Sequence, residues 1–374
     1  MQWLLYGANG YTGELIAREA AARGLRPILA GRSAERLAPL AQELGLDHRV
    51  FALDDARTVE RGLEGVRLVL HCAGPFSATA APMLEACLAA KAHYLDITGE
   101  IGVFEAARSL HDRAREAGIV ICPGVGFDVI PTDCVAARLK AALPDATHLA
   151  LGFDSRSGMS PGTARTSIEG LAQGGRMRID GSIRKVPFAS EVRRIDFGDG
   201  EKTAMCIPWG DVSTAWATTG IPNIAVFVPA SPRTIANARR ANRFGWLLRQ
   251  GWLQRWLQAR AGKTVRGPDA AKRERLRTFV WGEARNAAGA TRTARIQVAN
   301  GYALTVSGSL AVVEFLSSNR PARRLPHAIA AVRRRPDRAA AGLGAHADRM
   351  TPSRPARNAR VGKASSMRLE SPRP

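Results

Sequence analysis

A glycine pattern near the amino terminus has the spacing of a phosphate-binding turn. Gly7, Gly10 and Gly13 form GxxGxxG directly after the apolar run QWLLY and before a predicted helix. The first glycine permits a tight bend, the second lets a pyrophosphate approach the backbone, and the third lets helix and sheet pack closely. The phosphates then meet free N–H groups at the helix N-terminus. We therefore predict a dinucleotide site that also includes Tyr11 and Thr12; a purely structural turn is the alternative.

The end of the second predicted strand selects the cofactor. Sites for NAD usually place an Asp or Glu there, which holds the ribose 2′-hydroxyl. This strand ends instead in Ala30-Gly31-Arg32-Ser33, with a guanidinium and no carboxylate. Arg32 could hold a 2′-phosphate by paired hydrogen bonds, and Ser33 could add another. We therefore predict NADP(H) as the cofactor. The alternative is a surface cation at Arg32 and a simple helix cap at Ser33.

Two more loops are expected at the same edge of the sheet. Asp54 follows the third predicted strand and could approach the adenine, although with Asp55 it more often caps the next helix. The fourth strand leads into HCAGPF, in which Gly74 and Pro75 interrupt the chain. Ligands of open α/β sheets bind at these carboxyl ends of the strands. We expect Gly74 and Pro75 to border the nicotinamide; a plain turn is the alternative.

Tyr94, Asp96 and Glu100 are the predicted catalytic residues. They lie on or just after the fifth predicted strand, at the edge of the sheet that carries the glycine turn. Hydride transfer from a nicotinamide needs a group that polarises the acceptor or supplies a proton. A Tyr hydroxyl or a carboxyl of raised pKa could act in this way. As an alternative, Asp96 and Glu100 cap the next helix or pair with arginines; for Asp128 and Asp133 a helix cap is the prediction.

Other catalytic motifs are absent or unsuitable. None of the four tyrosines has a lysine four residues later, as the Tyr-x-x-x-Lys pair of short-chain dehydrogenases requires. Residues 158–162 match the hydrolase pattern GxSxG, but the oxyanion hole uses the N–H after the nucleophile, and Pro161 has none. Ser160 is therefore predicted to be a turn residue, and Thr163 a residue that could cap the next helix. No HExxH pattern or histidine cluster is present, and no metal is predicted.

Composition and charge limit the class of protein and its partners. The chain has 374 residues, 45% of them hydrophobic, which suits two folded domains and excludes a mostly disordered protein. The sequence contains no transmembrane run and no signal peptide is expected, so we predict a cytoplasmic protein. The five cysteines form no CxxC pair and are predicted to be reduced. Residues 320–374 carry 14 Lys and Arg against 3 Asp and Glu, about half of the net charge of +21.

This distribution of charge argues against a specific nucleic-acid partner. Residues 320–374 are predicted to be a disordered basic tail, for which binding to RNA or to an acidic membrane is the alternative. Residues 244–261 contain three of the seven tryptophans, with apolar residues around most of a helical wheel. We predict a packed or interface helix there; contact with a membrane or a lipid substrate is the alternative. The predicted membrane contact is at most peripheral.

Hydrophobic periodicity predicts an α/β protein. Strands and helices alternate over the first 125 residues, which indicates a doubly wound parallel sheet covered on both faces. From residue 148, polar and apolar residues alternate, which indicates a second domain with a largely antiparallel sheet. The predicted domains are residues 1–130 and 131–319. The predicted strands are residues 3–6, 27–30, 49–53, 68–72, 94–96, 119–122, 182–188, 193–197, 277–281 and 293–298, and the first predicted helices are residues 14–23, 34–44, 56–63, 78–91 and 103–117.

Several motifs occur together in the order found in one known family. The chain resembles the saccharopine dehydrogenase-like reductases, specifically the branch of trans-acting enoyl reductases. The matching segments are GANGYTG, AGRS, HCAGPF, HYLDITGE, GVGFDVIPTD, SPGTARTS and GPDAAKRERLRTFVWGEA. The resemblance implies an N-terminal NADP-binding Rossmann domain, a C-terminal α/β substrate domain, and a final helix near residues 310–316 that packs on the first domain.

The resemblance also implies an oxidoreductase of lipid metabolism. It favours an NADPH-dependent reductase that acts on an activated carbon–carbon double bond in a lipid-like acyl substrate. One alternative is a reductase of imines or carbonyl groups of the saccharopine dehydrogenase type. The other is a non-catalytic NADP-binding interaction protein. The expected partner is a small molecule, and a homodimer is left open because the sequence does not decide the oligomeric state.

Overall fold

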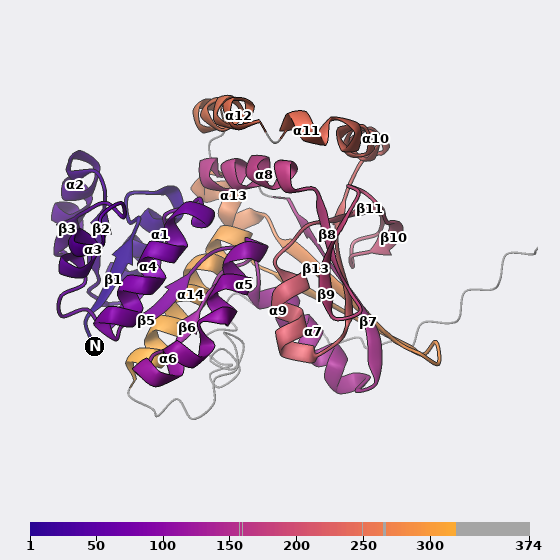
Figure 1. Cartoon of the computed structure of the whole chain (residues 1–374), viewed down its shortest axis with the longest axis horizontal. Coiled ribbons are helices and arrows are strands. Elements are labelled where there is room, and N and C mark those ends of the chain that lie inside the picture. Colours follow the sequence, from indigo (N-terminus) through magenta and orange to yellow (C-terminus); the bar gives the residue numbers. More distant parts are fainter. Residues whose placement is uncertain (157, 159, 249, 265–266, 319–374) are drawn as a thin grey trace, which may run out of the picture.

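Two β-sheets with helices packed against them make up the described part of the protein (Figure 1). The computed structural model describes residues 1–318 except 157, 159, 249 and 265–266. The predicted basic tail lies outside the described residues. Both predicted sheets are present, which confirms the predicted fold class, an α/β protein with one parallel and one largely antiparallel sheet.

The first sheet is fully parallel and has the strand order β3-β2-β1-β4-β5-β6. The order reverses between β1 and β4, and in open α/β sheets ligands bind in a crevice at the carboxyl ends of the strands beside this point. The inner strands β1, β2, β4 and β5 are short and mostly buried, as expected where helices cover both faces, whereas the edge strands β3 and β6 are more exposed. The strands are β1 (Trp3–Tyr6), β2 (Ile28–Gly31), β3 (His48–Val50), β4 (Leu68–His71), β5 (His93–Asp96) and β6 (Ile121–Cys122).

Helices cover both faces of this sheet because side chains of a strand alternate between its faces. Trp3 and Leu5 enter the core under α1 and α2, and Leu4 and Tyr6 enter the core under α3 and α4. The helix predicted over 103–117 is instead two helices that meet at Leu110, a correction to the sequence analysis. The helices are α1 (Tyr11–Ala22), α2 (Ala34–Leu44), α3 (Ala56–Gly62), α4 (Phe76–Ala90), α5 (Ile101–Ser109) and α6 (His111–Ala117).

The second sheet is mixed and mostly antiparallel. Its main path is β10-β11-β12-β7-β13-β14, with β8 and β9 attached through β12; only the β12–β7 pair is parallel. Helices α7 (Ile130–Ala142) and α9 (Asp211–Thr219) pack on this sheet. The strands are β7 (Ala146–Ser155), β8 (Gly175–Ile179), β9 (Ser182–Val186), β10 (Val192–Asp196), β11 (Glu201–Ile207), β12 (Asn223–Pro229), β13 (Thr278–Asn286) and β14 (Thr291–Val298).

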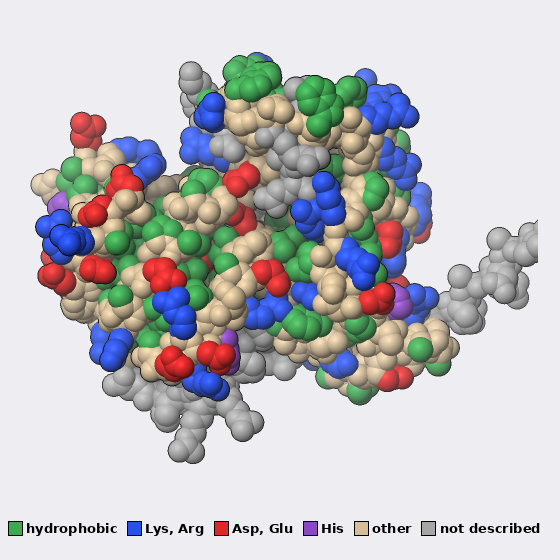
Figure 2. Space-filling view, viewed as in Figure 1, with side chains coloured by type: hydrophobic (Ala, Val, Ile, Leu, Met, Phe, Trp, Pro, Cys, Tyr) green, Lys and Arg blue, Asp and Glu red, His purple; other side chains and the backbone are tan. Residues whose placement is uncertain are grey.

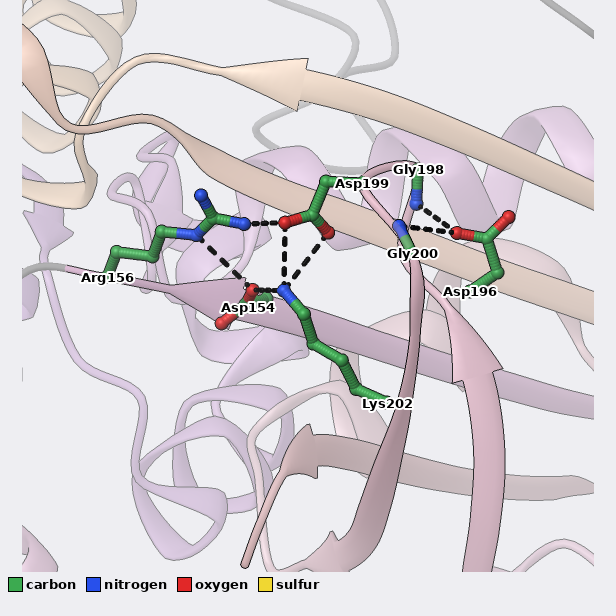
Figure 3. A network of polar contacts seen from close by, with 7 residues as sticks. All are labelled: Asp154, Arg156, Asp196, Gly198, Asp199, Gly200 and Lys202. Carbon is green, nitrogen blue, oxygen red and sulfur yellow. Dashed lines mark hydrogen bonds and ion pairs between the residues drawn. The ribbon is translucent and has the colours of Figure 1, made fainter.

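A polar network ties the β10–β11 hairpin to the end of β7 (Figure 3). The Lys202 ammonium lies 2.6 Å from the Asp154 carboxylate and 2.9 Å from that of Asp199. Arg156 pairs with the same two carboxylates. The Asp196 carboxylate accepts from the backbone amides of the hairpin turn, in which glycines adopt positive φ. Charges of both signs therefore fix this turn on the sheet.

The two halves of the chain meet where α5 packs on α9. The Ser213 hydroxyl donates to Glu105 (2.5 Å) and accepts from Arg108 (2.8 Å). The guanidinium groups of Arg108 and Arg178 lie over the Trp216 ring, 4.8 Å and 4.3 Å from its centroid. Cation–π contacts of this kind are stronger where water is excluded. They help to set the position of the second sheet relative to the first.

A row of helices forms one outer edge of the second half (Figure 1). It comprises α10 (Pro232–Ala241), the short helix η1 (Asn242–Phe244), α11 (Gly245–Leu248) and α12 (Gly251–Thr264). The last two pack on α8 (Pro161–Gln173). The prediction of a packed or interface helix over 244–261 is correct in that both helices pack on α8, but the segment is divided between α11 and α12 and its tryptophans are exposed.

Helix α14 (Gly301–Ser317) returns from the second sheet to the first. Val306, Leu310 and Val313 join the core that contains Trp3 and Ile16, and α14 contacts α1 and β4. This confirms the expected final helix that packs on the first sheet. None of the five cysteines, all in the described part of the chain, forms a disulfide. In the described part of the chain, no helix combines the length and apolar character needed to cross a membrane.

Leu310→Ala tests the contribution of α14 to the first core. Leu310 is fully buried, so its truncation leaves a cavity and should lower the free energy of unfolding by about 2–5 kcal/mol. Urea denaturation measures this change. Glu314→Ala is the matched control on the same helix, because the ion pair of Glu314 with Arg23 is long at 3.6 Å and adds little to stability. Equal losses in the two variants would contradict the packing described.

Candidate functional site

The glycine turn is closely packed against the loop after β4. Gly7 has φ +82°, and a Cβ there would lie 2.8 Å from the backbone nitrogen of Ala73. A Cβ on Gly13 would lie 2.2 Å from the Gly7 carbonyl oxygen. Only glycine fits either position without a shift of the backbone. The turn after β1 and the loop after β4 therefore meet across the crevice where the strand order reverses.

The second glycine leaves space at the N-terminus of α1. A Cβ on Gly10 would meet only the Gly7 carbonyl oxygen, at 3.2 Å. Gly10 is the N-cap of α1, and no side chain caps this end of the helix. Tyr11 and Thr12, in the first turn, are partly exposed. This cradle of backbone amides fits the pyrophosphate of a dinucleotide, which a helix N-terminus also favours electrostatically.

Two arginines lie beside the turn at the end of β2. Arg32 is exposed, and Ser33 is the N-cap of α2 without a side-chain cap hydrogen bond, so its hydroxyl is not used for capping. Arg36, which the sequence analysis missed, donates to the Asn9 carbonyl oxygen at 3.1 Å. A second guanidinium thus stands next to the glycine turn. The sequence could have indicated Arg36, because it lies in the first turns of α2, directly after the predicted 2′-phosphate site.

Asp54 and Asp55 differ in what they contact. The Asp55 carboxylate accepts from the Thr58 amide at 2.8 Å and caps α3, and these hydrogen bonds lower the pKa of Asp55. Capping was the alternative predicted for this pair, and the structure shows it for Asp55. Asp54 is exposed at the carboxyl end of the sheet. Its predicted contact with adenine stays a prediction.

A segment of the second half reaches over the glycine turn. The Tyr11 hydroxyl donates to the Pro268 carbonyl oxygen at 2.5 Å and accepts from Arg273 at 3.1 Å. The Tyr302 ring lies edge-on to Tyr11, with the centroids 5.0 Å apart. A Cβ on Gly267 would lie 2.4 Å from the Tyr11 ring. Arg273, on α13 (Ala270–Arg275), therefore brings a cation to the phosphate turn, which sequence spacing could not reveal.

Glu100 caps a helix other than the one expected. Its carboxylate accepts from the backbone amides of Phe76 (2.9 Å) and Ser77 (2.7 Å), at the N-terminus of α4 directly after Gly74 and Pro75. Glu100 is the N-cap residue of α5, but its side chain does not cap that helix. Burial raises the pKa of Glu100, while the two amides lower it. Glu100 thus lies at the predicted nicotinamide border.

Tyr94 and Asp96 are buried below the crevice. The Asp96 carboxylate accepts from the Tyr94 hydroxyl (2.7 Å) and from the amides of Thr98 (3.0 Å) and Gly124 (2.8 Å). Burial raises the pKa of Asp96 to about 6 against the effect of these donors, and it raises the pKa of Tyr94 as well. Both side chains are fully buried. Their burial favours a positioning role over the direct catalytic role predicted from the sequence.

Asp128 is a carboxyl at the crevice that the sequence analysis placed as a helix cap. That prediction is wrong, because the N-cap of α7 is Val129 and no side chain caps the helix. A Cβ on Gly99 would lie 3.0 Å from Asp128 Oδ2, so the carboxyl packs against the loop that carries Glu100. Burial, followed by the Glu100 charge, raises the pKa of Asp128 to about 7. Asp128 is partly exposed and can hold a proton near neutral pH.

Asp133 and Ser160 have structural contacts. Asp133 lies inside α7 and accepts from the Thr218 hydroxyl at 2.7 Å, so it is not a helix cap either. Ser160 is the N-cap of α8 and accepts from the Thr163 amide at 3.2 Å. The sequence analysis considered Thr163 as the cap of this helix, but the structure shows Ser160 in that position. The Thr166 hydroxyl of α8 lies 3.5 Å from the Glu100 carboxylate, which brings α8 to the crevice.

The turn, the reversal of strand order and the guanidinium at β2 define a dinucleotide-binding domain of Rossmann type. Residues 3–122 match the family model described as the saccharopine dehydrogenase NADP binding domain. This part of the chain is thus similar to that domain, and the expected cofactor, NADP(H), agrees with the match.

Curated relatives agree with the predicted branch. The chain is 32% identical over 183 residues to the trans-acting enoyl reductase of Mycobacterium tuberculosis, and 31% identical over 183 residues to that of Mycobacterium ulcerans. Each match covers 45% of this chain and 44% of the relative, so it spans less than half of these relatives.

Among solved structures, the chain is similar in fold to the apo saccharopine dehydrogenase (L-Glu forming) of Saccharomyces cerevisiae. The TM-score is 0.59 at 12% identity, over 90% of this chain and 96% of that one. This likeness extends the shared fold to the second sheet.

Arg32→Ala should discriminate between the two nicotinamide cofactors. Loss of a charge-assisted contact with the 2′-phosphate removes about 1.5–3 kcal/mol and should raise the Kd of NADPH about 10- to 100-fold. The Kd of NADH should change little, since it lacks this phosphate. Fluorescence titration measures both constants, and Arg115→Ala, exposed on α6, is the control. Equal losses for NADPH and NADH would refute the assignment.

Asp128→Asn should stabilise the protein at pH 8. Because the folded protein raises the pKa of Asp128 to about 7, it binds the proton more tightly than the unfolded chain does. The wild type therefore loses stability as the pH rises from about 4 through about 7, and the neutral amide avoids this loss. Urea denaturation at pH 5 and pH 8 measures the difference. Asp112→Asn, exposed on α6, is the control; a gain that is the same at both pH values would contradict the burial of a carboxylate at residue 128.

Proposed function

We propose that the protein is an NADPH-dependent reductase of an activated carbon–carbon double bond in a lipid-like acyl substrate. One observation carries the proposal: the Asp128 carboxyl, with a pKa of about 7, packs on the loop that carries Glu100, at the edge of the sheet where the glycine turn lies. A proton source thus stands beside the predicted nicotinamide border. The match of residues 3–122 to the saccharopine dehydrogenase NADP binding domain and the similarity to trans-acting enoyl reductases support the same chemistry.

Reduction of an enoyl thioester needs a hydride at Cβ and a proton at Cα. Bound NADPH would supply the hydride. Asp128 would donate the proton to Cα as the hydride arrives, and would regain it from water after the saturated product leaves. Glu100 holds the N-terminus of α4, and its charge adds to the effect of burial in raising the pKa of Asp128. Asp96, with Tyr94, fixes the loops after β5 and β6 on which Glu100 and Asp128 stand.

An aromatic cluster next to Asp128 suits an acyl chain. The Trp209 indole donates to the Asp128 carbonyl oxygen at 3.1 Å. Its ring lies 4.9 Å from that of Phe153, which lies 5.5 Å from that of Phe127. Phe127 and Trp209 are partly exposed. Apolar surroundings of this kind both bind hydrocarbon and raise the pKa of a neighbouring carboxyl.

The remaining expectations belong to the same proposal. Residues 1–130 would bind the cofactor and residues 131–319 would bind the substrate, except that α14 packs on the first sheet. Gly7, Gly10, Tyr11, Thr12 and Gly13 would bind the pyrophosphate. Arg32 and Ser33 would bind the 2′-phosphate, Asp54 the adenosine, and Gly74 and Pro75 the nicotinamide. We place the enzyme in the cytoplasm.

A substrate panel tests the reaction class. Oxidation of NADPH is followed at 340 nm with enoyl thioesters of increasing chain length, with ketones, and with preformed imines. The proposal expects turnover of the enoyl thioesters, with a KM that falls as the chain lengthens. Turnover of imines or ketones alone would establish a saccharopine dehydrogenase-type reductase instead. Tight NADPH binding without turnover of any acceptor would favour a non-catalytic NADP-binding protein.

Asp128→Asn tests the proton donor. The amide has the same shape but no transferable proton, so kcat should fall about 10²- to 10⁴-fold while the Kd of NADPH stays the same. In the wild type, kcat should fall as the pH rises above about 7, because the acid must be protonated to donate. The variant should lose this descending limb. Wild-type kcat and an unchanged pH profile in the variant would exclude Asp128.

A further inference from the structure

The surface formed by α10, η1, α11 and α12 is the feature of the molecule that the proposed reaction leaves unexplained. We infer that this surface docks the protein on an anionic lipid bilayer, with the tryptophans of α11 and α12 inserted between the headgroups. The inference is independent of the reaction, since docking needs neither cofactor nor turnover.

Large aromatic side chains project from these helices into solvent. The exposed fractions are 56% for Phe244, 63% for Trp246, 59% for Trp252 and 54% for Trp256. Trp252 and Trp256 lie one turn apart on α12 and so share a face. Figure 2 shows hydrophobic side chains gathered at the outer edge of the molecule over α11 and α12. Exposed aromatic side chains gathered in this way are typical of an interaction site.

The charged residues of the segment that carries the patch all have one sign. Residues 212–268 contain nine Lys and Arg and no Asp or Glu. Arg239, Arg240, Arg243 and Arg255 are exposed beside the aromatic residues, and the guanidinium of Arg260 lies 5.6 Å from the Trp256 ring centroid. Figure 2 shows Lys and Arg side chains on both sides of the patch. The partner that complements this surface is therefore anionic as well as apolar.

A lipid headgroup layer matches this combination better than a protein copy does. Tryptophan and arginine are residues that settle at the membrane interface, because their apolar parts enter the acyl boundary while their polar groups stay at the headgroups. Anionic lipids add about 1 kcal/mol for each Lys or Arg near the surface. A second copy of the chain would place the same positive charges opposite each other, which electrostatics opposes.

The inner side of the patch connects to the crevice. Helices α11 and α12 pack on α8, whose Thr166 lies 3.5 Å from Glu100. The backbone amide of Ser160, the N-cap of α8, donates to the Tyr302 hydroxyl. The Tyr302 ring packs on Tyr11 of the glycine turn. A bilayer at the outer side of α11 and α12 would therefore lie one helix layer away from the wall of the site.

Quenching of tryptophan fluorescence by lipid provides a test specific to this surface. The full-length protein is mixed with vesicles of phosphatidylcholine and phosphatidylglycerol that contain brominated phosphatidylcholine, and with phosphatidylcholine vesicles alone. Residues 319–374 contain no tryptophan, so the basic tail cannot produce quenching by itself. We expect quenching and a blue shift with the anionic vesicles. Both should be lost in Trp252→Ala/Trp256→Ala, in which the exposed Trp246 still reports any remaining contact of the surface with lipid.

A matched pair of charge reversals tests the electrostatic part. Arg239→Glu/Arg243→Glu should lower the partition into anionic vesicles at least about tenfold. Arg57→Glu/Arg61→Glu, exposed with the same spacing on α3, should leave it unchanged. Circular dichroism and the Kd of NADPH confirm that each variant is folded.

Three outcomes would overturn the inference. The first is sedimentation with vesicles without quenching, which assigns the binding to the tail. The second is a dimer in sedimentation velocity that Trp252→Ala/Trp256→Ala dissociates, which makes the surface an interface between copies. The third is quenching by single-stranded RNA but not by anionic vesicles, which makes the ligand a nucleic acid.

Discussion

The structure depends on the close approach of two backbone segments across the reversal of strand order. The turn after β1 and the loop after β4 are so near that a Cβ on Gly7 would lie 2.8 Å from Ala73, and one on Gly13 would lie 2.2 Å from Gly7 itself. Any side chain at these positions would separate β1 from β4 or displace α1. The contact that closes the first sheet therefore also points the N-terminus of α1 at the crevice. Folding and the proposed cofactor binding both require that these two positions carry no side chain.

The carboxyls around the crevice divide into those that hold the site and those that can act in it. Asp96 is fully buried, but three donors satisfy it, and it joins the loops after β5 and β6. Glu100 is satisfied by two amides of α4. For Asp128 the desolvation is not offset by comparable hydrogen bonds, so its pKa rises furthest of the three, to about 7. A carboxyl that is expensive to ionise destabilises the fold at neutral pH, and this is typical of a group kept for its chemistry.

The local pattern of the chain was enough to predict the first sheet. Its strands and helices follow from apolar runs and their periodicity, and GxxGxxG was informative because of its place after β1. The failures have a common physical origin. The roles of Glu100, Arg273 and Asp128 arise from contacts with residues far along the chain, such as Glu100 with Ser77 and Tyr11 with Arg273. Sequence spacing carries information about a residue's own helix, so each of these side chains was assigned to the nearest helix or missed.

Residues 244–264 also show what sequence spacing cannot predict, here for a surface rather than for a site. Their apolar residues spread around a helical wheel, which favoured a single packed or interface helix. The chain instead breaks near residue 250, and both helices pack on α8 while their tryptophans are exposed. A helical wheel drawn over one unbroken helix places the side that packs on α8 and the exposed side at overlapping angles, so the two sides cannot be told apart. Only when the break is known does the outer face separate as aromatic and basic, which is the combination that a lipid interface selects and a protein core does not.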